Sequence, residues 1–145
     1  FDFDVHHGNG TQDIFYDDKS IFFCSLHQDP RTLFPFRTGF KEENNAHVCN
    51  LPLAPGSGDR ELLEAAKQGL EAARKFKPEF IAVSAGFDTY TSDRISSINV
   101  EKSETYKQIG KLISELNLPT FAVLEGGYYL PDLGKNVWSF ISGFR

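Results

Sequence analysis

Short apolar runs alternate with amphipathic segments along the chain. Runs of strand length occupy residues 1–5, 21–26, 48–53, 80–84 and 120–124. The runs at 21–26, 80–84 and 120–124 are largely apolar, which is typical of strands buried on both faces. The segment 27–46 contains Pro and Gly and is predicted to be a loop.

The segments between these runs carry helical periodicity. Helices are predicted over 59–75, 103–116 and 132–140, and a short helix from Thr11 through Tyr16. Each longer helix has one apolar stripe. The stripes are Leu62, Ala66, Leu70 and Ala73 in the first helix, Tyr106, Ile109, Ile113 and Leu116 in the second, and Leu133, Val137 and Phe140 in the third. A single apolar stripe indicates a helix that covers a core with one face.

This alternation predicts an α/β fold, a three-layer parallel sheet with helices on both faces. With 145 residues and no linker or repeat, the chain 1–145 is predicted to be a single domain. Ligands of such sheets bind beyond the carboxyl ends of the strands. The residues that directly follow each strand are therefore the first candidates for a functional site.

Composition narrows the class of protein. Hydrophobic residues make up 40% and charged residues 24%, and no apolar run reaches the roughly 18 residues of a membrane span. The net charge of -5 argues against nucleic acid or an anionic membrane as partner and suits a cationic substrate. Cys24 and Cys49 lie in apolar segments, so no disulfide framework is expected and a reducing, cytoplasmic location fits. No signal peptide is visible.

The chain begins in a β-favouring stretch and contains no Met. A terminal strand normally has a polar lead-in. We therefore expect an incomplete fold whose N-terminal part is missing, with the chain forming the C-terminal portion of a catalytic domain.

Chemically active side chains follow the predicted strands. Asp4 and His6 follow the first, Asp88 follows the run at 80–84, and Tyr128 follows the run at 120–124. Two carboxylates and an imidazole can hold one divalent cation and leave a position open for water. Each residue also has a plain structural interpretation, as a cap, a turn or a packing residue, and their joint placement favours the metal site.

Three sequence motifs resemble those of the histone deacetylase and acetylpolyamine amidohydrolase superfamily. They are Asp-Val-His-His-Gly-Asn-Gly-Thr-Gln at 4–12, Ser-Ala-Gly-Phe-Asp at 84–88 and Leu-Glu-Gly-Gly-Tyr at 124–128. Their order and spacing agree as well, over essentially the whole chain. Phe34-Pro35-Phe36 and residues 131–134 are most similar to the acetylpolyamine amidohydrolase branch. The resemblance implies an arginase/deacetylase-like fold.

The resemblance also implies roles for individual residues. Asp4, His6 and Asp88 would ligate zinc, although ferrous iron and cobalt also suit this ligand set. Tyr128 would polarise the scissile carbonyl, and Phe34 and Gly127 would line the substrate tunnel. The reaction would be hydrolysis of an N-acetyl amide, either acetyl-lysine or an acetylpolyamine, by metal-activated water.

The sequence departs from the family in its general base. That base is a pair of adjacent histidines in an earlier segment, which this sequence does not contain. Asp2 and Asn9 match the residues that orient the pair. The isolated chain is therefore expected to have little or no activity.

A potassium ion is a further implication of the resemblance. Asp2, Asp4, His6, Ser25 and Leu26 match the family's site beneath the catalytic metal, partly through backbone carbonyls. The alternative for Ser25 is that its hydroxyl satisfies a backbone group.

Two other classes of function remain open. An arginase-type enzyme would need additional Asp ligands, but the corresponding positions are Gly8 and Gly86, whose missing side chains make a two-metal site unfavourable. A metal-binding or assembly module without catalysis is the other alternative. Exposed strand edges and apolar surface would favour association, so a homo-oligomer is possible.

Overall fold

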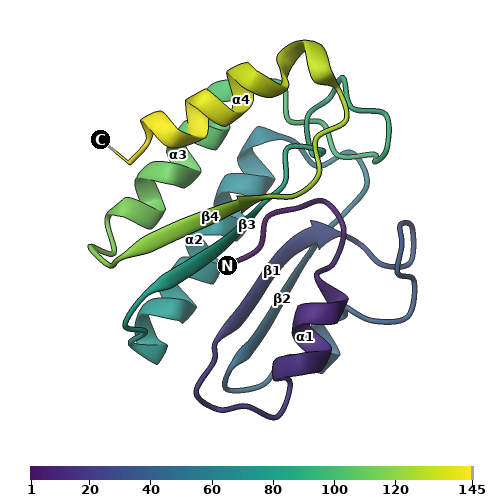
Figure 1. Ribbon diagram of the computed structural model, residues 1–145. Coiled ribbons are helices and arrows are strands. Elements are labelled where there is room, and N and C mark those ends of the chain that lie inside the picture. The colour runs from purple at the N-terminus through teal and green to yellow at the C-terminus, as the bar shows by residue number, and fades with distance from the viewer. Residues whose placement is uncertain (145) are drawn as a thin grey trace.

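The computed structural model describes residues 1–144 and contains every predicted helix (Figure 1). The strands are β1 (Phe23–Gln28), β2 (Val48–Leu53), β3 (Ile81–Ala85) and β4 (Thr120–Leu124). The helices are α1 (Asn9–Phe15), α2 (Asp59–Phe76), α3 (Ser103–Ser114) and α4 (Leu130–Ser142), with a short 3-10 turn, η1, at Lys41–Glu43. The ends of these helices and strands lie within two residues of the predicted ends.

The strands form two parallel pairs, β1 with β2 and β3 with β4. The expected strand at 1–5 is wrong as a regular element, because only Asp2 makes ladder contacts, with Ser25 on one side and Ser84 on the other. The amide of Asp2 donates to the Cys24 carbonyl at 2.8 Å, and the amide of Phe3 donates to the Ser84 carbonyl at 3.1 Å. The first residues thus join the two pairs before the chain bends away.

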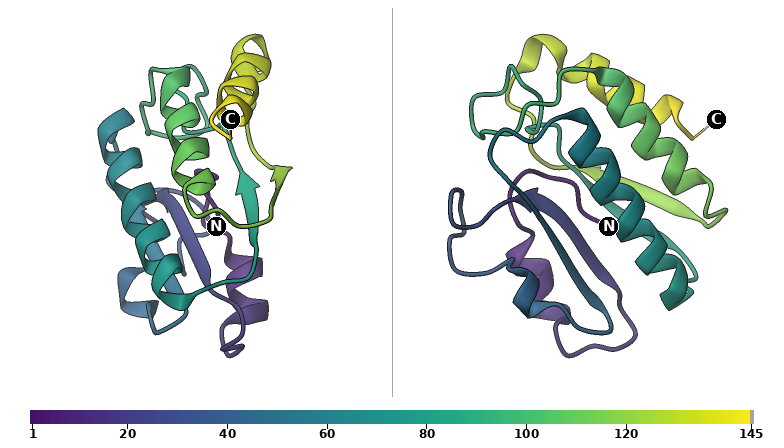
Figure 2. Two further views of the ribbon diagram at one scale, coloured as in Figure 1. Left: turned by 90° about the vertical axis from the view of Figure 1, so that its left-hand side faces the viewer. Right: turned by 180° about the vertical axis from the view of Figure 1, so that it is seen from behind.

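Helices lie on both sides of the strands, as expected for three layers. Helix α2 packs on β1 and β2, α3 packs beside α2, and α4 packs on α3. Figure 2 shows α1 on the opposite side of the strands from α2. The predicted stripe of α2 is buried, as are Tyr106, Ile109 and Ile113 of α3.

Aromatic side chains connect the first residues to the helical layer. The ring of Phe3 is fully buried and lies 5.8 Å from the Phe87 ring and 5.2 Å from the Phe140 ring, measured between centroids. Phe87 also packs edge-on against Tyr106 at 5.0 Å. Because Phe3 and Phe87 each precede a carboxylate by one residue, this packing fixes the backbone that carries Asp4 and Asp88.

Strand β4 corrects a second expectation. The apolar run at 120–124 predicts a buried strand, but the side chains of Phe121, Val123 and Leu124 are 56%, 52% and 55% exposed. The strand pairs with β3 along one edge only, and its other edge has no neighbouring strand among residues 1–144. The apolar residues of a strand indicate that it is suited to burial, but they do not show whether another element covers it. Within the same residues, no helix is both long and apolar enough to cross a bilayer.

We expect Gly134→Ala to stabilise the chain by up to about 1 kcal/mol, since alanine has the higher helix propensity. A Cβ at this exposed position in α4 would meet no atom within 4 Å. The matched variant Gly110→Ala should destabilise, because its Cβ would lie 2.3 Å from the Phe140 carbonyl oxygen where α3 meets α4. Urea unfolding of both variants measures the two shifts, and equal shifts would contradict this packing.

Candidate metal centre

Local hydrogen bonds shape the bend that carries the first two candidate ligands. The Asp2 carboxylate accepts from the Asp4 amide at 3.0 Å, and the Asp4 carboxylate accepts from the His6 amide at 2.8 Å. Carboxylates commonly bond the amide two residues on, and such bonds replace the extended conformation by a turn. The predicted strand alternation therefore ends at Asp4, but Asp4 and His6 still reach the same side of the chain.

Asp88 enters the site from the end of β3. Its side chain is fully buried, and Oδ1 accepts from the Val5 amide at 2.9 Å, a bond that joins segments 83 residues apart. Close backbone approach requires glycine here, because a Cβ on Gly86 would lie 2.4 Å from the Asp4 Cα. The glycine of the 84–88 motif thus brings the two carboxylates together.

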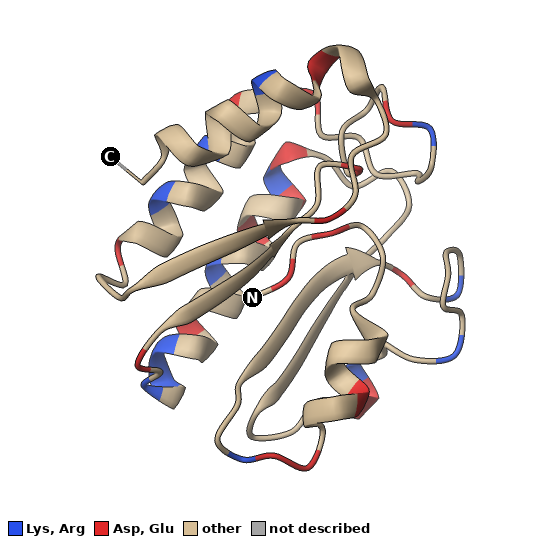
Figure 3. Cartoon of the chain, viewed as in Figure 1, with Lys and Arg blue, Asp and Glu red and all other residues tan. Residues whose placement is uncertain are grey.

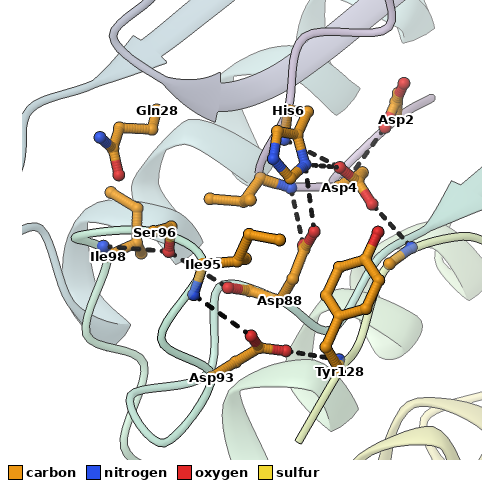
Figure 4. A network of polar contacts seen from close by, with 12 residues as sticks. Asp2, Asp4, His6, Gln28, Asp88, Asp93, Ile95, Ser96, Ile98 and Tyr128 are labelled. Atoms are coloured by element: carbon orange, nitrogen blue, oxygen red, sulfur yellow. Dashed lines mark hydrogen bonds and ion pairs between the residues drawn. The ribbon is translucent and has the colours of Figure 1, made fainter. Parts of the chain in front are cut away.

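The three predicted metal ligands converge. One donor atom each from Asp4, His6 and Asp88 lies within 4.8 Å of the others. His6 Nδ1 is 3.0 Å from Asp4 Oδ1 and 3.3 Å from Asp88 Oδ2 (Figure 4). Although Asp88 Oδ2 is buried, no described residue gives it a hydrogen bond. A buried carboxylate oxygen without a donor, facing an imidazole and a second carboxylate, fits a divalent cation.

The carboxylates and the imidazole at this end of the sheet shift one another's pKa. Acidic segments lie beside the strand ends, in addition to those on helices and outer loops, whereas Lys and Arg lie on helices and outer loops (Figure 3). The carboxylate of Asp4, which accepts from the His6 ring, and then the carboxylate of Asp88, 3.3 Å from the ring, raise the pKa of His6 to about 10. Burial opposes ionisation of Asp4, yet bonds from His6 hold the pKa of this carboxyl below its usual value. Burial raises the pKa of Asp88. The metal-free site therefore holds a proton on His6, which a bound cation would replace.

We expect the metal-free chain to lose stability as pH rises from about 6.5 to about 10, a range set by the ordinary and the folded pKa of His6. A raised folded pKa means that the native state binds the proton more tightly, so this stabilisation is complete below the lower value. Urea unfolding in the presence of chelator measures it. His6→Asn should flatten the slope across this range, and an unchanged slope would contradict the assignment.

The candidate catalytic residue lies beside these ligands. Tyr128 is 61% exposed, and its hydroxyl points toward Asp4 and His6 (Figure 4). A cavity of about 460 Å³ runs along this side, and its lining includes Asp2, Asp4, His6, Asn9 and Tyr128. Partial burial and then the charges of Asp88 and Asp4 raise the pKa of Tyr128, so the hydroxyl keeps its proton near neutral pH.

The residues expected to orient the histidine pair reach the same cavity. Asp2 is 6% exposed, and burial raises its pKa to about 7. Asn9 begins α1 and is exposed. Both residues line the cavity beside the proposed ligands, and their roles stay a prediction.

The remaining predicted residues are less closely gathered. Phe34 is 58% exposed in the loop after β1 and does not line the cavity, and Gly127 packs beside Leu133 instead of opening into it. For the potassium set, the Leu26 amide donates to the Asp2 carbonyl, and the Ser25 hydroxyl pairs with the buried His27 ring at 2.9 Å. The Ser25 hydroxyl therefore bonds a side chain here and does not satisfy a backbone group, as the alternative had it.

One polar residue next to Tyr128 is absent from the sequence prediction. The buried Asp93 carboxylate accepts from the backbone amides of Tyr128 and Tyr129. Asp93 is in the loop after β3 and belongs to none of the three motifs. Its partners are 35 and 36 residues away, so no local pattern could have identified this contact.

Comparison with known proteins agrees with this geometry. Residues 1–144 match the family model described as the histone deacetylase domain. A probable deacetylase of Methanothermobacter thermautotrophicus is 45% identical over 98% of the chain, and an acetylpolyamine amidohydrolase of Burkholderia pseudomallei is 37% identical over 99%. The crystal structure of an acetylpolyamine aminohydrolase from Burkholderia pseudomallei superposes with a TM-score of 0.93, at 36% identity over 99% of this chain.

The matched region is only part of each relative. The chain spans 44% of the Methanothermobacter protein and 43% of both Burkholderia chains. Because the family model covers residues 1–144 and the motifs at 4–12, 84–88 and 124–128 come together in space, the chain belongs to the histone deacetylase family.

Proposed function

We propose that this chain carries the metal centre of a zinc-dependent amidohydrolase that removes acetyl groups from N-acetylated amines, either acetyl-lysine or acetylpolyamines. One observation carries the proposal: the buried Oδ2 of Asp88, which accepts no hydrogen bond from the described residues, lies 3.3 Å from the His6 ring and faces Asp4, and the Tyr128 hydroxyl points to the same place. Ferrous iron or cobalt could replace zinc with the same ligands. A cytoplasmic location is part of the proposal.

In this proposal Asp4, His6 and Asp88 hold the zinc ion. When bound, the ion supplies Lewis acidity, which polarises a carbonyl and lowers the pKa of water. The Tyr128 hydroxyl donates a hydrogen bond to the substrate carbonyl oxygen and stabilises the negative charge that develops there. Phe34 and Gly127, which do not line the described cavity, would border the substrate tunnel beyond it. A potassium ion held by Asp2, Asp4, His6, Ser25 and Leu26 would offset the clustered carboxylates.

We propose that the general base comes from elsewhere, since the described imidazoles near the site are paired with carboxylates or are buried with a lowered pKa. His6 lies between two carboxylates. His7 Nε2 pairs with Gln12 while Nδ1 has no partner among residues 1–144, and burial lowers the pKa of this ring, which is 3% exposed. His27 is fully buried, and burial lowers its pKa to about 4. Asp2 and Asn9 would orient imidazoles that reach this cavity from outside the chain. We therefore propose that the chain alone has little or no turnover.

The exposed apolar surface of β4 supports a second candidate role. Phe121, Val123 and Leu124 lie on a strand with an open edge, and such edges favour association. We propose self-association through this edge, independent of catalysis. Sedimentation should show a dimer or larger species for the wild type and a monomer when Val123→Lys is introduced; identical masses would contradict it.

The test of the main proposal combines metal content with hydrolysis. The chain, folded with zinc and dialysed, should retain one zinc ion per chain and hydrolyse neither an acetyl-lysine peptide nor an N-acetylated diamine. Tyr128→Phe should retain the same zinc content, because the phenol is not a ligand. A well-folded chain without zinc would refute the metal centre, whereas rapid turnover by the chain alone would refute its dependence on an external base.

A further inference from the structure

Tyr128 occupies a segment that has little structure of its own. Residues 125–129 lie between β4 and α4 and belong to neither. Gly127, immediately before the tyrosine, has a φ of +140°, a conformation that side-chain-bearing residues rarely adopt. With 61% of its surface exposed, Tyr128 is not fixed by packing either. Whatever fixes the direction of the phenol must act through the backbone of this segment.

Asp93 provides that restraint. Its Oδ2 accepts from the Tyr128 amide at 2.5 Å and from the Tyr129 amide at 3.2 Å. Only 4% of the residue is exposed, and no described basic side chain lies within ion-pair distance of it. Backbone amides are therefore the groups that offset the buried carboxylate, which makes both partners depend on the contact.

A purely local role for Asp93 does not account for this arrangement. A turn-forming Asp bonds the amide two residues on, and here the corresponding bond to Ile95 is long, at 3.4 Å. The short bonds instead reach across to the tyrosine segment (Figure 4). The Asp93 amide in turn donates to the Tyr90 carbonyl at 2.8 Å, which anchors the residue in the loop that begins at Asp88. The loop of a metal ligand is thereby joined to the backbone of Tyr128.

We propose that Asp93 is a positioning residue for the deacetylation reaction: its buried carboxylate holds the Tyr128 backbone so that the phenol stays turned toward the metal ligands. The inference rests on the proposed function for the role of Tyr128. It predicts that Asp93 governs the direction of the tyrosine without governing metal affinity, because the carboxylate contacts none of the three ligands directly.

Two variants and one control test the inference on the 145-residue chain. Asp93→Ala removes the acceptor, whereas Asp93→Asn keeps an oxygen of the same shape that accepts a weaker bond. Asp132→Ala is the matched control, since it removes a neighbouring carboxylate that accepts from the Tyr90 hydroxyl at 3.0 Å and does not contact the Tyr128 amide. Zinc affinity of each variant is measured alongside.

The first readout is amide hydrogen exchange at Tyr128 and Tyr129 in the metal-free chain. Asp93→Ala should accelerate exchange at both amides by about tenfold or more, Asp93→Asn by less, and Asp132→Ala should leave it unchanged. Unchanged exchange in Asp93→Ala would overturn the inference. This readout needs no metal, so it remains decisive even if the proposed metal centre is wrong.

The second readout is the ¹⁹F spectrum of the chain labelled with 3-fluorotyrosine, in which Tyr128→Phe identifies the resonance. Zinc should shift the Tyr128 signal in the wild type and in Asp132→Ala. In Asp93→Ala the response should be lost while zinc affinity stays within about threefold, and Asp93→Asn should restore it in part. A wild-type response in Asp93→Ala overturns the positioning role. A wild-type chain that binds no zinc instead overturns the proposed function.

Discussion

Replacing Asp88 by asparagine is expected to lower zinc affinity by more than about a hundredfold. Loss of a residue that only hydrogen-bonds to a metal ligand costs roughly 10–100-fold, and Asp88 is itself a proposed ligand. The amide oxygen of the variant can still accept from the Val5 amide, which Asp88 Oδ1 binds at 2.9 Å. The amide nitrogen then takes the place of the unpartnered Oδ2. A neutral donor would face the cation where an anionic oxygen faced it before. Competition with a chromogenic chelator measures the change.

Stability separates this loss from simple unfolding. Burial disfavours the charged form of Asp88, so the neutral variant should unfold within about 1 kcal/mol of the wild type when both are metal-free. Asp29→Asn is the matched control, an equal loss of charge at a carboxylate that pairs with Arg31 outside the cavity. Wild-type zinc affinity in Asp88→Asn would contradict the assignment of Asp88 as a ligand. If the variant loses its fold as well as its zinc affinity, the loss of affinity does not support the assignment.

Local patterns predicted the regular elements well. Strand β2 has the ends that its sequence indicated, and the α2 stripe from Leu62 to Ala73 is buried, because both follow from side-chain periodicity over one segment. The convergence of the three proposed metal ligands was predictable for a different reason. Asp4, His6 and Asp88 each follow a segment that runs in the same direction, and parallel segments bring such residues to one edge.

Three features of the structure did not follow from side-chain periodicity. Phe1 to Val5 has a strand-like pattern, but the Asp2 and Asp4 carboxylates accept from the Asp4 and His6 amides and bend the chain, and no periodicity encodes these bonds. The apolar residues of β4 predicted burial, which depends on a neighbour that the pattern does not describe. Asp93 carried no signal at all, since its partners are remote in sequence.

Adding a single methyl group at Gly126 is expected to abolish tight zinc binding while the chain stays folded. A Cβ there would lie 2.2 Å from Asp88 Oδ2 and 2.6 Å from Asp4 Oδ2, well inside contact distance. Both obstacles are carboxylate ends, which can rotate away, so Gly126→Ala should move the ligands and not the backbone. Metal sites tolerate only about 0.2 Å of error in ligand distance. We expect at least about a hundredfold loss of affinity, measured by chelator competition.

Gly86, which also lies against Asp4, is the comparison position for Gly126. A Cβ on Gly86 would lie 2.4 Å from the Asp4 Cα, so Gly86→Ala must displace main chain and should lower zinc affinity and unfolding free energy together. Gly134→Ala, with open space around its Cβ, should lower neither. Retained affinity in Gly126→Ala would mean that the carboxylates do not converge where the structure has them. Parallel losses in both site variants would mean that Asp4 and Asp88 belong to the rigid core, with no freedom to rotate away from a methyl group.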